Sequence, residues 1–376
     1  MLFDESHELF RQTCERFTSE HLTPHALEWE EAGEFPRELY AKAAAAGILG
    51  VSFPEEYGGG GGDVLHAMIS VETSLECGSS GLVAGLGSLG IALPPILFLG
   101  DDEQKRRFIP PVLAGQRIAA LAITEPGTGS DVAGIRTRAV REGDGYRIDG
   151  AKTFITSGVR ADQVTLLTRT GPDKHGGLTF FVVERGTPGF TVSRALKKTG
   201  WWASDTAELS FDGVRVPAEN RLGNEGSGFL ALMQNFQNER LALAVYGHAT
   251  AAIALEDALA YAKEREAFGR KLVGFQVTRH KLARMATRVA AARTFNYDVA
   301  RRVAAGEYLV GEVSMAKNFA AEVAQEVCYD AVQILGGMGY MRETRAERLS
   351  RDARLLPIGG GTTEIMNEII AKHLGL

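Results

Sequence analysis

The stretch GFLALMQNFQNERLALAVYGHA, residues 228–249, decides the fold of the last third of the chain. Its apolar residues recur at every third or fourth position, which is the period of an α-helix. The same period holds over residues 226–265, 275–305 and 312–335, and each of these ranges is much longer than an average globular helix. Long helices with short connections are typical of a bundle, so residues 226–376 are predicted to form a C-terminal four-helix bundle.

Before residue 226 the pattern changes twice. Residues 1–117 carry the helical period and are predicted to form an N-terminal helical domain. Residues 118–225 contain short β-rich runs, such as QVTLLTRT and LTFFVVERG, between glycine, proline and aspartate residues, which indicates a middle β barrel or sandwich. The predicted fold class is mainly α with a β domain. No βαβ rhythm supports a Rossmann sheet.

The run EEYGGGGGD, residues 55–63, interrupts the N-terminal helical pattern. Five consecutive glycines leave the backbone without the constraint of a Cβ atom, so this run is predicted to be a mobile loop. A contact with a ligand is the alternative interpretation.

Composition excludes several classes of function. The chain has 376 residues, 45% of them hydrophobic, and a formal net charge of -6, so a nucleic acid or an anionic membrane surface is not an expected partner. Cys14, Cys77 and Cys328 lie far apart, and the eight histidines show no ligand spacing, so neither disulfides nor a metal site is expected. The N-terminus lacks the pattern of a signal peptide, and no apolar run has the length of a membrane span. A cytoplasmic protein without membrane insertion is expected.

Two motifs carry a resemblance to a known family. LAITEPGTGSDVAG, residues 121–134, reads on its own as a turn-rich linker, but its ordered mix of hydroxyl, acid, proline and glycine residues resembles the first signature of the acyl-CoA dehydrogenase family. QILGGMGYMRETRAERLSRD, residues 333–352, is similar to the second signature. KTFITSG (152–158), GWWASDTAEL (200–209) and REAFGRKLVGFQ (265–276) also resemble the family, so the likeness spans nearly the whole chain.

The resemblance implies FAD as the cofactor. Carried over residue by residue, it places FAD against Leu121, Ile123, Thr124, Gly129, Ser130, Phe154, Thr156, Thr362 and Glu364, and, from a neighbouring subunit, against Arg265, Phe268, Gln276, Gln333 and Gly337. The hydroxyls of Thr124 and Thr156 would form hydrogen bonds with the flavin, and Phe154, where the family often has tryptophan, would pack against its face. A shared cofactor site implies a homo-oligomer, expected to be a tetramer built as a dimer of dimers.

Several of these residues have a plain structural interpretation beside the functional one. Phe154 reads as a core residue, Arg265 as a solvated charge at a helix end, and Gln333 as a surface amide. Glu364 carries a negative charge near expected phosphates, so Thr362 is the better candidate of the two.

The residue that removes the substrate's α-proton is expected to be unusual. In most relatives a glutamate stands in the segment that corresponds to IGGGTTE, residues 358–364, and here that position is Gly360. Glu239 lies on a helical stripe with the apolar residues Leu232, Phe236, Leu243 and Tyr246, so burial is expected to raise its pKa. A salt bridge with a neighbouring basic residue is the alternative for Glu239.

The pattern NERLAL with GGGTTEI resembles a minority of the family, which includes isovaleryl-CoA and long-chain enzymes and carries its base on this helix. The resemblance then implies that Glu239 is the catalytic base, that the Gly360 N–H donates to the thioester carbonyl, and that the substrate contacts Ser130, Phe236, Arg240, Tyr246 and Gly361.

The expected function is FAD-dependent α,β-dehydrogenation of an acyl-CoA, as in the β-oxidation of fatty acids or in branched-chain catabolism, with electrons passed to an electron-transfer flavoprotein. Two alternatives stay open. One is a flavin oxidase or monooxygenase of the same fold. The other is a catalytically inactive paralogue that binds FAD and acyl-CoA, because the usual acid is missing at position 360.

Overall fold

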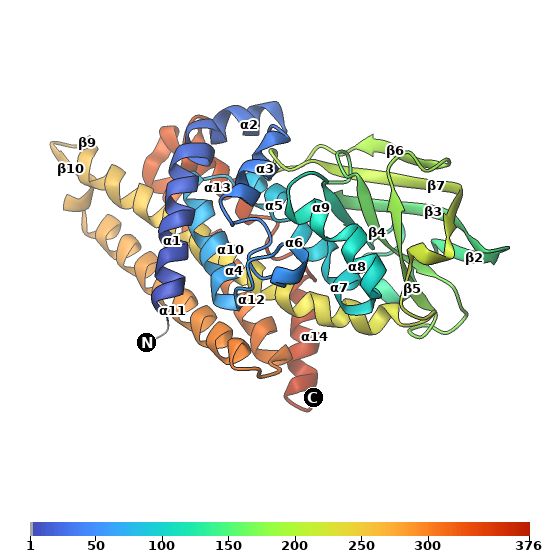
Figure 1. The fold of residues 1–376 in the computed structure, drawn as a ribbon. Helices are drawn as coiled ribbons and strands as arrows, with labels where there is room; N and C mark the ends of the chain where they lie inside the picture. The colour runs from blue at the N-terminus through green and yellow to red at the C-terminus, as the bar shows by residue number, and fades with distance from the viewer. Residues whose placement is uncertain (1–2) are drawn as a thin grey trace.

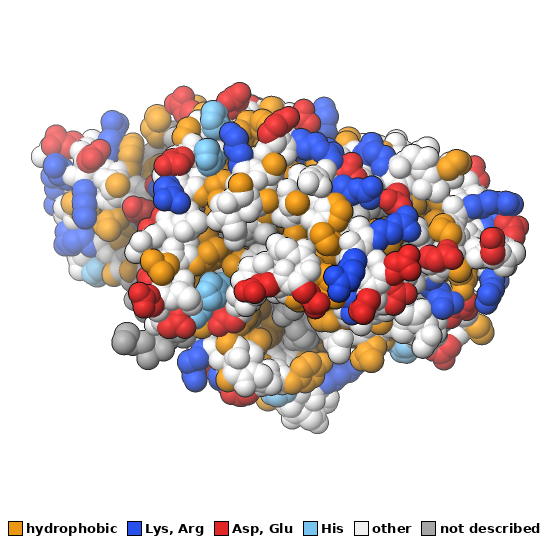
Figure 2. Space-filling view, viewed as in Figure 1, with side chains coloured by type: hydrophobic (Ala, Val, Ile, Leu, Met, Phe, Trp, Pro, Cys, Tyr) orange, Lys and Arg blue, Asp and Glu red, His pale blue; other side chains and the backbone are white. Residues whose placement is uncertain are grey.

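The computed structural model describes residues 3–376 and has a helical part and a β part. Figure 1 shows the β-sheet at one end of the molecule and the three longest helices running through the rest of it. Acidic and basic side chains are interspersed over the face seen in Figure 2, in keeping with the small net charge. The fold class predicted from the sequence, helical with a middle β domain, is confirmed.

Between residues 3 and 117 the N-terminal part has nine α-helices, which are α1 (Glu5–Phe17), α2 (Ala26–Ala32), α3 (Glu38–Ala45), α4 (Val64–Ser74), α5 (Ser80–Leu86), α6 (Leu89–Ala92), α7 (Pro94–Leu99), α8 (Asp102–Phe108) and α9 (Pro110–Leu113). Asp4, Asp63 and Asp101 begin α1, α4 and α8 as N-caps, and each accepts a hydrogen bond from a backbone N–H of the first turn. In the described part of the chain no single helix has the length and apolar composition of a membrane span. One bent pair, Ser80–Leu86 with Leu89–Leu99, passes that test on length and composition.

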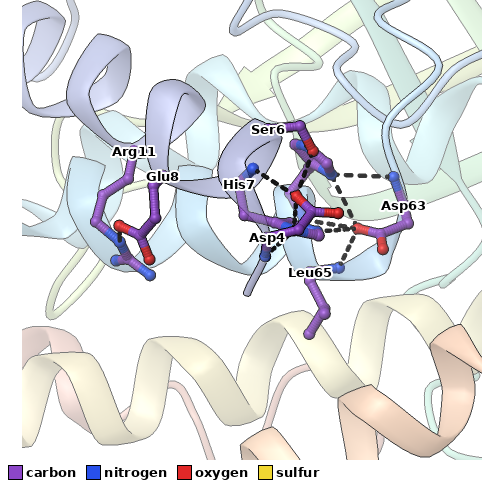
Figure 3. Close-up of polar contacts among 8 residues, drawn as sticks. Asp4, Ser6, His7, Glu8, Arg11, Asp63 and Leu65 are labelled. Atoms are coloured by element: carbon purple, nitrogen blue, oxygen red, sulfur yellow. Dashed lines mark hydrogen bonds and ion pairs between the residues drawn. The ribbon is translucent and has the colours of Figure 1, made fainter. Parts of the chain in front are cut away.

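Two of these caps meet where α1 and α4 begin (Figure 3). Asp63 Oδ1 lies 3.1 Å from His7 Nε2 and 2.9 Å from His66 Nδ1, and the two imidazole rings lie 4.1 Å apart. These three side chains are close enough to hold a metal ion, a grouping that their spacing in the sequence does not reveal. Asp63 Oδ1 already accepts hydrogen bonds from the backbone N–H groups of Leu65 and His66, so helix capping accounts for the arrangement.

The glycine run is ordered, and the prediction of a mobile loop is wrong. Backbone hydrogen bonds tie Gly60 to Gly50, Gly61 to Phe53, and Gly62 to Val51. A Cβ atom on Gly60 would lie 2.9 Å from the Val51 carbonyl oxygen. Glycine is needed here because one backbone segment passes directly against another.

The middle part is a mixed sheet of eight strands, β1 (Ala119–Ala122), β2 (Arg138–Glu142), β3 (Gly145–Thr156), β4 (Gln163–Arg169), β5 (Leu178–Glu184), β6 (Phe190–Ala195), β7 (Thr206–Pro217) and β8 (Arg221–Leu222). The strand order is β6-β7-β3-β2-β4-β5-β8, with β1 parallel to β4. In the described chain β6 and β8 do not pair with each other, so the sheet is open and not a closed barrel. β3 is irregular between Lys152 and Ile155, and this irregularity matters for the site.

The C-terminal part contains α10 (Gly228–Glu264), α11 (Gln276–Ala304) and α12 (Val310–Leu335), followed by α13 (Arg345–Ala353) and α14 (Thr363–His373), which pack on α12. A two-stranded hairpin, β9 (Glu266–Ala267) and β10 (Arg270–Lys271), joins α10 to α11. The helices α10 and α12 approach closely at Gly247, where a Cβ atom would lie 2.7 Å from the Ala320 carbonyl carbon. The predicted helical bundle is confirmed, with helix ends within a few residues of the predicted ranges.

A partly buried ionic cluster joins α4, α10 and α11. Glu72 Oε1 lies 3.3 Å from His248 Nε2 and 3.1 Å from Arg293 Nε, and the Tyr297 hydroxyl donates to the other carboxylate oxygen. The His248 side chain is fully buried, and its Nδ1 lies 2.8 Å from the Asn296 amide. These contacts hold the pKa of Glu72 at about 2, well below its ordinary value, despite burial.

Candidate active site

The structure brings Glu239 and Gly360 together. Gly360 has φ +64°, and a Cβ atom placed on it would lie 3.6 Å from Glu239 Oε1 and would collide with Leu243. The left-handed backbone and the missing side chain therefore leave space directly beside the Glu239 carboxylate. A side chain at position 360 would first meet Leu243, whereas the Glu239 carboxylate on α10 faces the same space.

The Glu239 carboxylate is not engaged by the protein. Among residues 3–376 it has no hydrogen bond or ion pair, so the salt bridge considered as its alternative is absent from the described structure. Its neighbour Arg240 instead donates from Nε to the Gly360 carbonyl oxygen at 3.2 Å. Burial raises the pKa of Glu239 above its ordinary value, while the charges of Arg240 and Lys317 act in the opposite direction.

The turn beside Glu239 is held by a residue that sequence reasoning missed. Lys317 on α12 is fully buried, and its Nζ donates to the Gly361 carbonyl oxygen at 2.6 Å. Gly361 has φ +102°, so two consecutive glycines adopt left-handed backbone. A lysine within the apolar stretch VSMAKNFAAEVA of α12 was the available signal, because a charge on a buried helix face requires a partner.

Replacing Gly360 with alanine is expected to lower the free energy of unfolding by roughly 1–3 kcal/mol, because alanine would be strained at this φ and would collide with Leu243. Denaturant unfolding measures the loss. Gly359→Ala is the matched control, since a Cβ atom at Gly359 would find its nearest neighbour at 3.7 Å in Leu355. Equal stability of the two variants would contradict a tightly restricted turn.

The other residues predicted to contact the substrate lie in two separate parts of the structure. Phe236 and Tyr246 share α10 with Glu239, and the Arg240 guanidinium lies 5.2 Å from the Phe236 ring centre. Tyr246 is buried and stacks on Trp201, with ring centres 5.4 Å apart. Trp201 was missed by sequence reasoning, and its φ of +56° marks a restrained backbone. Ser130 is exposed in the loop after β1 and is not part of this group.

A second set of predicted residues, named here the β-domain group, comes from the end of β1, the loop that follows it and the end of β3: Leu121, Ile123, Thr124, Gly129, Ser130, Phe154 and Thr156. Leu121 and Ile123 are buried, Thr124 and Thr156 are half-buried, and Gly129 and Ser130 are exposed. A Cβ atom on Gly129 would meet nothing within 4 Å, so internal packing does not require glycine there. The loop thus presents accessible backbone N–H groups and hydroxyls, which fits a bound phosphate and flavin edge.

Phe154 is not a core residue. Its side chain is 69% exposed, and its φ of +61° coincides with the irregularity of β3. A large aromatic residue with left-handed backbone is rare and costs about 1–3 kcal/mol, which surrounding structure must offset. An exposed ring held in such a conformation beside two hydroxyls fits a flat aromatic cofactor.

A buried ion pair under this loop was also missed from the sequence. Lys152 Nζ lies 2.9 Å from Glu125 Oε1 and donates to the Ile123 carbonyl oxygen at 2.7 Å. The Glu125 carboxylate also accepts hydrogen bonds from the backbone N–H groups of Arg136 and Thr137. Burial lowers the pKa of Lys152 to about 8. The pair fixes the residues on either side of Thr124.

The remaining predicted cofactor residues, named here the bundle-tip group, are Arg265, Phe268, Gln276, Gln333 and Gly337, and all of them are exposed. Figure 1 shows that the β9–β10 hairpin, which carries Phe268 in its turn, lies at the opposite end of the molecule from the sheet. Phe268 is 96% exposed with φ +51°. One chain alone therefore does not bring the hairpin residue Phe268 together with the β-domain group.

Thr362 and Glu364 stand where α14 begins, directly after the glycine turn. The Thr362 hydroxyl oxygen accepts a hydrogen bond from the Ile365 N–H at 3.3 Å, so Thr362 is the N-cap of α14. Glu364 is exposed in the first turn, where the helix dipole favours a carboxylate without any ligand. An N-cap role thus accounts for Thr362 locally.

Comparisons with known proteins agree in all three parts of the chain. Family models for the N-terminal, middle and C-terminal domains of acyl-CoA dehydrogenases match residues 4–116, 120–214 and 226–375. The long-chain specific acyl-CoA dehydrogenase of pig mitochondria is 40% identical over 376 residues, covering 99% of this chain and 87% of the relative.

Two solved structures share the whole fold. The crystal structure of a probable acyl-CoA dehydrogenase from Mycobacterium abscessus has 53% identity and a TM-score of 0.98, with 100% of both chains covered. A glutaryl-CoA dehydrogenase from Mycobacterium smegmatis, solved in complex with FADH2, has 28% identity and a TM-score of 0.93, with 99% of this chain and 95% of that chain covered. The chain therefore belongs to the acyl-CoA dehydrogenase family of FAD-dependent oxidoreductases.

Proposed function

We propose that this chain removes the α-proton of an acyl-CoA thioester with Glu239, in the course of α,β-dehydrogenation. The observation that carries the proposal is the unengaged Glu239 carboxylate beside the left-handed Gly360 turn. FAD, when bound, supplies the two-electron acceptor for the β-hydride. A carboxylate with a raised pKa is well matched to abstracting a proton from carbon near neutral pH.

The Gly360 N–H is proposed to donate a hydrogen bond to the thioester carbonyl oxygen. Polarising that carbonyl makes the α-carbon more acidic, because negative charge that develops on the oxygen is stabilised by a fixed donor. The base and the donor would then act on neighbouring atoms of one substrate beside Gly360. Phe236, Arg240, Tyr246 and Gly361 are proposed to line the surroundings of the thioester, and Ser130 a more distant part of the substrate.

FAD is proposed to bind the β-domain group of one chain and, in addition, Thr362 and Glu364. Thr156 would donate a hydrogen bond to the flavin, Thr124, whose hydroxyl donates to the Thr153 carbonyl oxygen, would accept one, and Phe154 would pack on its face. The bundle-tip group is proposed to reach the FAD of a neighbouring subunit, which is why a homotetramer is expected. The separation of the β9–β10 hairpin, which carries Phe268, from the sheet within one chain supports this arrangement.

Phe268→Ser is expected to lower the amount of FAD that copurifies while leaving the fold intact, because the ring is 96% exposed in the single chain. The flavin-to-protein absorbance ratio and light scattering after gel filtration measure occupancy and assembly together. Tyr308→Ser, which removes a ring that is 75% exposed elsewhere, is the control. A wild-type chain that is monomeric yet fully loaded with FAD would contradict the proposal.

Two alternative activities are separated by one experiment. Anaerobic mixing of the holoenzyme with a panel of straight and branched acyl-CoAs should bleach the flavin, and reoxidation by an electron-transfer flavoprotein should outpace hydrogen peroxide formation in air. Rapid peroxide formation would indicate an oxidase or monooxygenase. Binding of acyl-CoA without bleaching would indicate an inactive paralogue.

The finer details of organisation are also proposals. Domain boundaries after residues 117 and 225 are supported by the family-model matches. A cytoplasmic location is proposed from the three cysteines, which are free and buried in the described structure and fit a reducing compartment. Base placement on α10 favours branched or long acyl chains by analogy with the subgroup that shares it.

A further inference from the structure

Two buried cations hold the glycine turn beside Glu239. Arg240 Nε donates to the Gly360 carbonyl oxygen at 3.2 Å, and Lys317 Nζ donates to the Gly361 carbonyl oxygen at 2.6 Å. They come from different helices, α10 and α12, and contact two consecutive carbonyls of the same left-handed turn. This arrangement fixes the peptide groups that immediately follow the Gly360 N–H.

Burying the Lys317 ammonium costs more free energy than one hydrogen bond to a carbonyl oxygen returns. The residue is fully buried, and burying an ammonium costs far more than burying a methionine of similar length unless the charge is used. An ammonium has three donors, and in the described structure Nζ donates to one acceptor, Gly361. The backbone carbonyl alone does not account for a cation at this position.

We propose that Lys317 is a positioning residue of the reaction, which orients the Gly360–Gly361 turn toward the thioester and supplies positive charge opposite Glu239. This inference rests on the proposed function, because it assumes that the Gly360 N–H and Glu239 act on the substrate. It concerns a residue on α12 that contacts the turn and is assigned no contact with FAD.

The titratable groups around this point come from four parts of the fold. Glu239 and Arg240 lie on α10, Lys317 on α12, Glu364 on α14, and Tyr308 in the connection before α12. Burial, followed by the charge of Arg240, lowers the pKa of Lys317 to about 8, while Glu239 and Glu364 oppose this effect. Lys317 and Arg240 both favour ionised Glu239 against the effect of burial, so removing Lys317 favours the protonated form, which cannot act as a base.

Lys317→Met in the holoenzyme tests the inference. We expect the rate of flavin reduction to fall roughly a hundredfold, as is typical when a reacting geometry is displaced, with a smaller change in KM. The acid limb of the pH–rate profile is expected to move to higher pH. The infrared carbonyl stretch of a bound, carbonyl-labelled 2-enoyl-CoA, which needs no turnover, is expected to move toward its value in solution.

Two further variants complete the test. Lys372→Met removes an exposed charge from α14 and is expected to leave all three readouts unchanged. Lys317→Arg keeps the positive charge but changes the length and shape of the side chain. The acid limb of its pH–rate profile should therefore lie close to that of the wild type, while the carbonyl stretch of the bound ligand stays displaced. If Lys317→Met does not fold, the carbonyl stretch of the ligand bound to Lys317→Arg tests the inference instead.

An unchanged carbonyl stretch together with an unchanged acid limb in a folded Lys317 variant would overturn the inference. That result differs from failure of the proposed function. If wild-type holoenzyme is not bleached by any acyl-CoA, the proposed function fails, whereas normal bleaching in both wild type and Lys317→Met defeats the inference alone.

Discussion

Replacing Glu239 with glutamine is expected to slow flavin reduction by acyl-CoA about 10³-fold or more, the upper range for loss of a general base. Glutamine keeps the size and the polarity of the side chain, but its amide cannot accept a proton. The Glu239 carboxylate makes no hydrogen bond or ion pair in residues 3–376, so the change should not disturb the fold. Stopped-flow absorbance of the flavin under anaerobic conditions measures the rate.

FAD content and affinity for a non-reactive thioester should be unchanged in Glu239→Gln. Glu368→Gln, which alters an exposed carboxylate on α14 that is assigned no role in the site, is the control and should reduce flavin at nearly the wild-type rate. Full activity in Glu239→Gln, or a loss as large in Glu368→Gln, would contradict Glu239 as the base.

Replacing Glu72 with alanine is expected to lower the free energy of unfolding by about 1–3 kcal/mol, because the buried His248 ring and the Tyr297 hydroxyl lose the carboxylate that they contact. The change leaves His248 and Arg293 without their shared carboxylate and removes the acceptor of the Tyr297 hydroxyl. Glu76→Ala, an exposed position one turn further on, should cost far less. Denaturant unfolding of both variants at neutral pH measures the difference.

The cost of Glu72→Ala should depend on pH. The pKa of Glu72 is about 2 in the folded protein, against 4.5 for an unperturbed glutamate, because His248, Tyr297 and Arg293 favour its ionised form. Because folding lowers the pKa of Glu72, its ionised carboxylate stabilises the fold fully at pH values above the pKa of the unfolded state. This contribution is lost as the pH falls from about 4.5 toward 2. The stability gap between wild type and variant should therefore narrow in acid. A gap that widens in acid would contradict the assignment.

The long helices were predictable because their apolar period runs uninterrupted for many turns. The range predicted as residues 226–265 is α10 at Gly228–Glu264, and the two following helices agree as closely. Closure of the β domain was not predictable, since strand patterns define faces but not which edge strands pair. The prediction for the glycine run failed for a different reason. The pattern alone suggested mobility, but glycine also permits close contact between backbone segments, as Gly60 against Val51 shows.

The candidate site was predictable where a departure from the family pattern pointed to it. Gly360 in place of an acid directed attention to Glu239, and the structure places the two side by side. Lys317 and Lys152 were missed because their partners include backbone carbonyls, which no sequence pattern identifies. Trp201 was missed because its backbone N–H donates to Asp352, 151 residues away in the chain.

The most direct test of Glu239 as the base separates proton removal from hydride transfer. A 3-thia-acyl-CoA has sulfur in place of the β-carbon, so its α-proton is removed with no β-hydride to follow. Wild-type holoenzyme in deuterium oxide is predicted to exchange the α-hydrogen of this ligand, observed by proton NMR, while Glu239→Gln binds it without exchange. Exchange at the wild-type rate in Glu239→Gln would contradict the account.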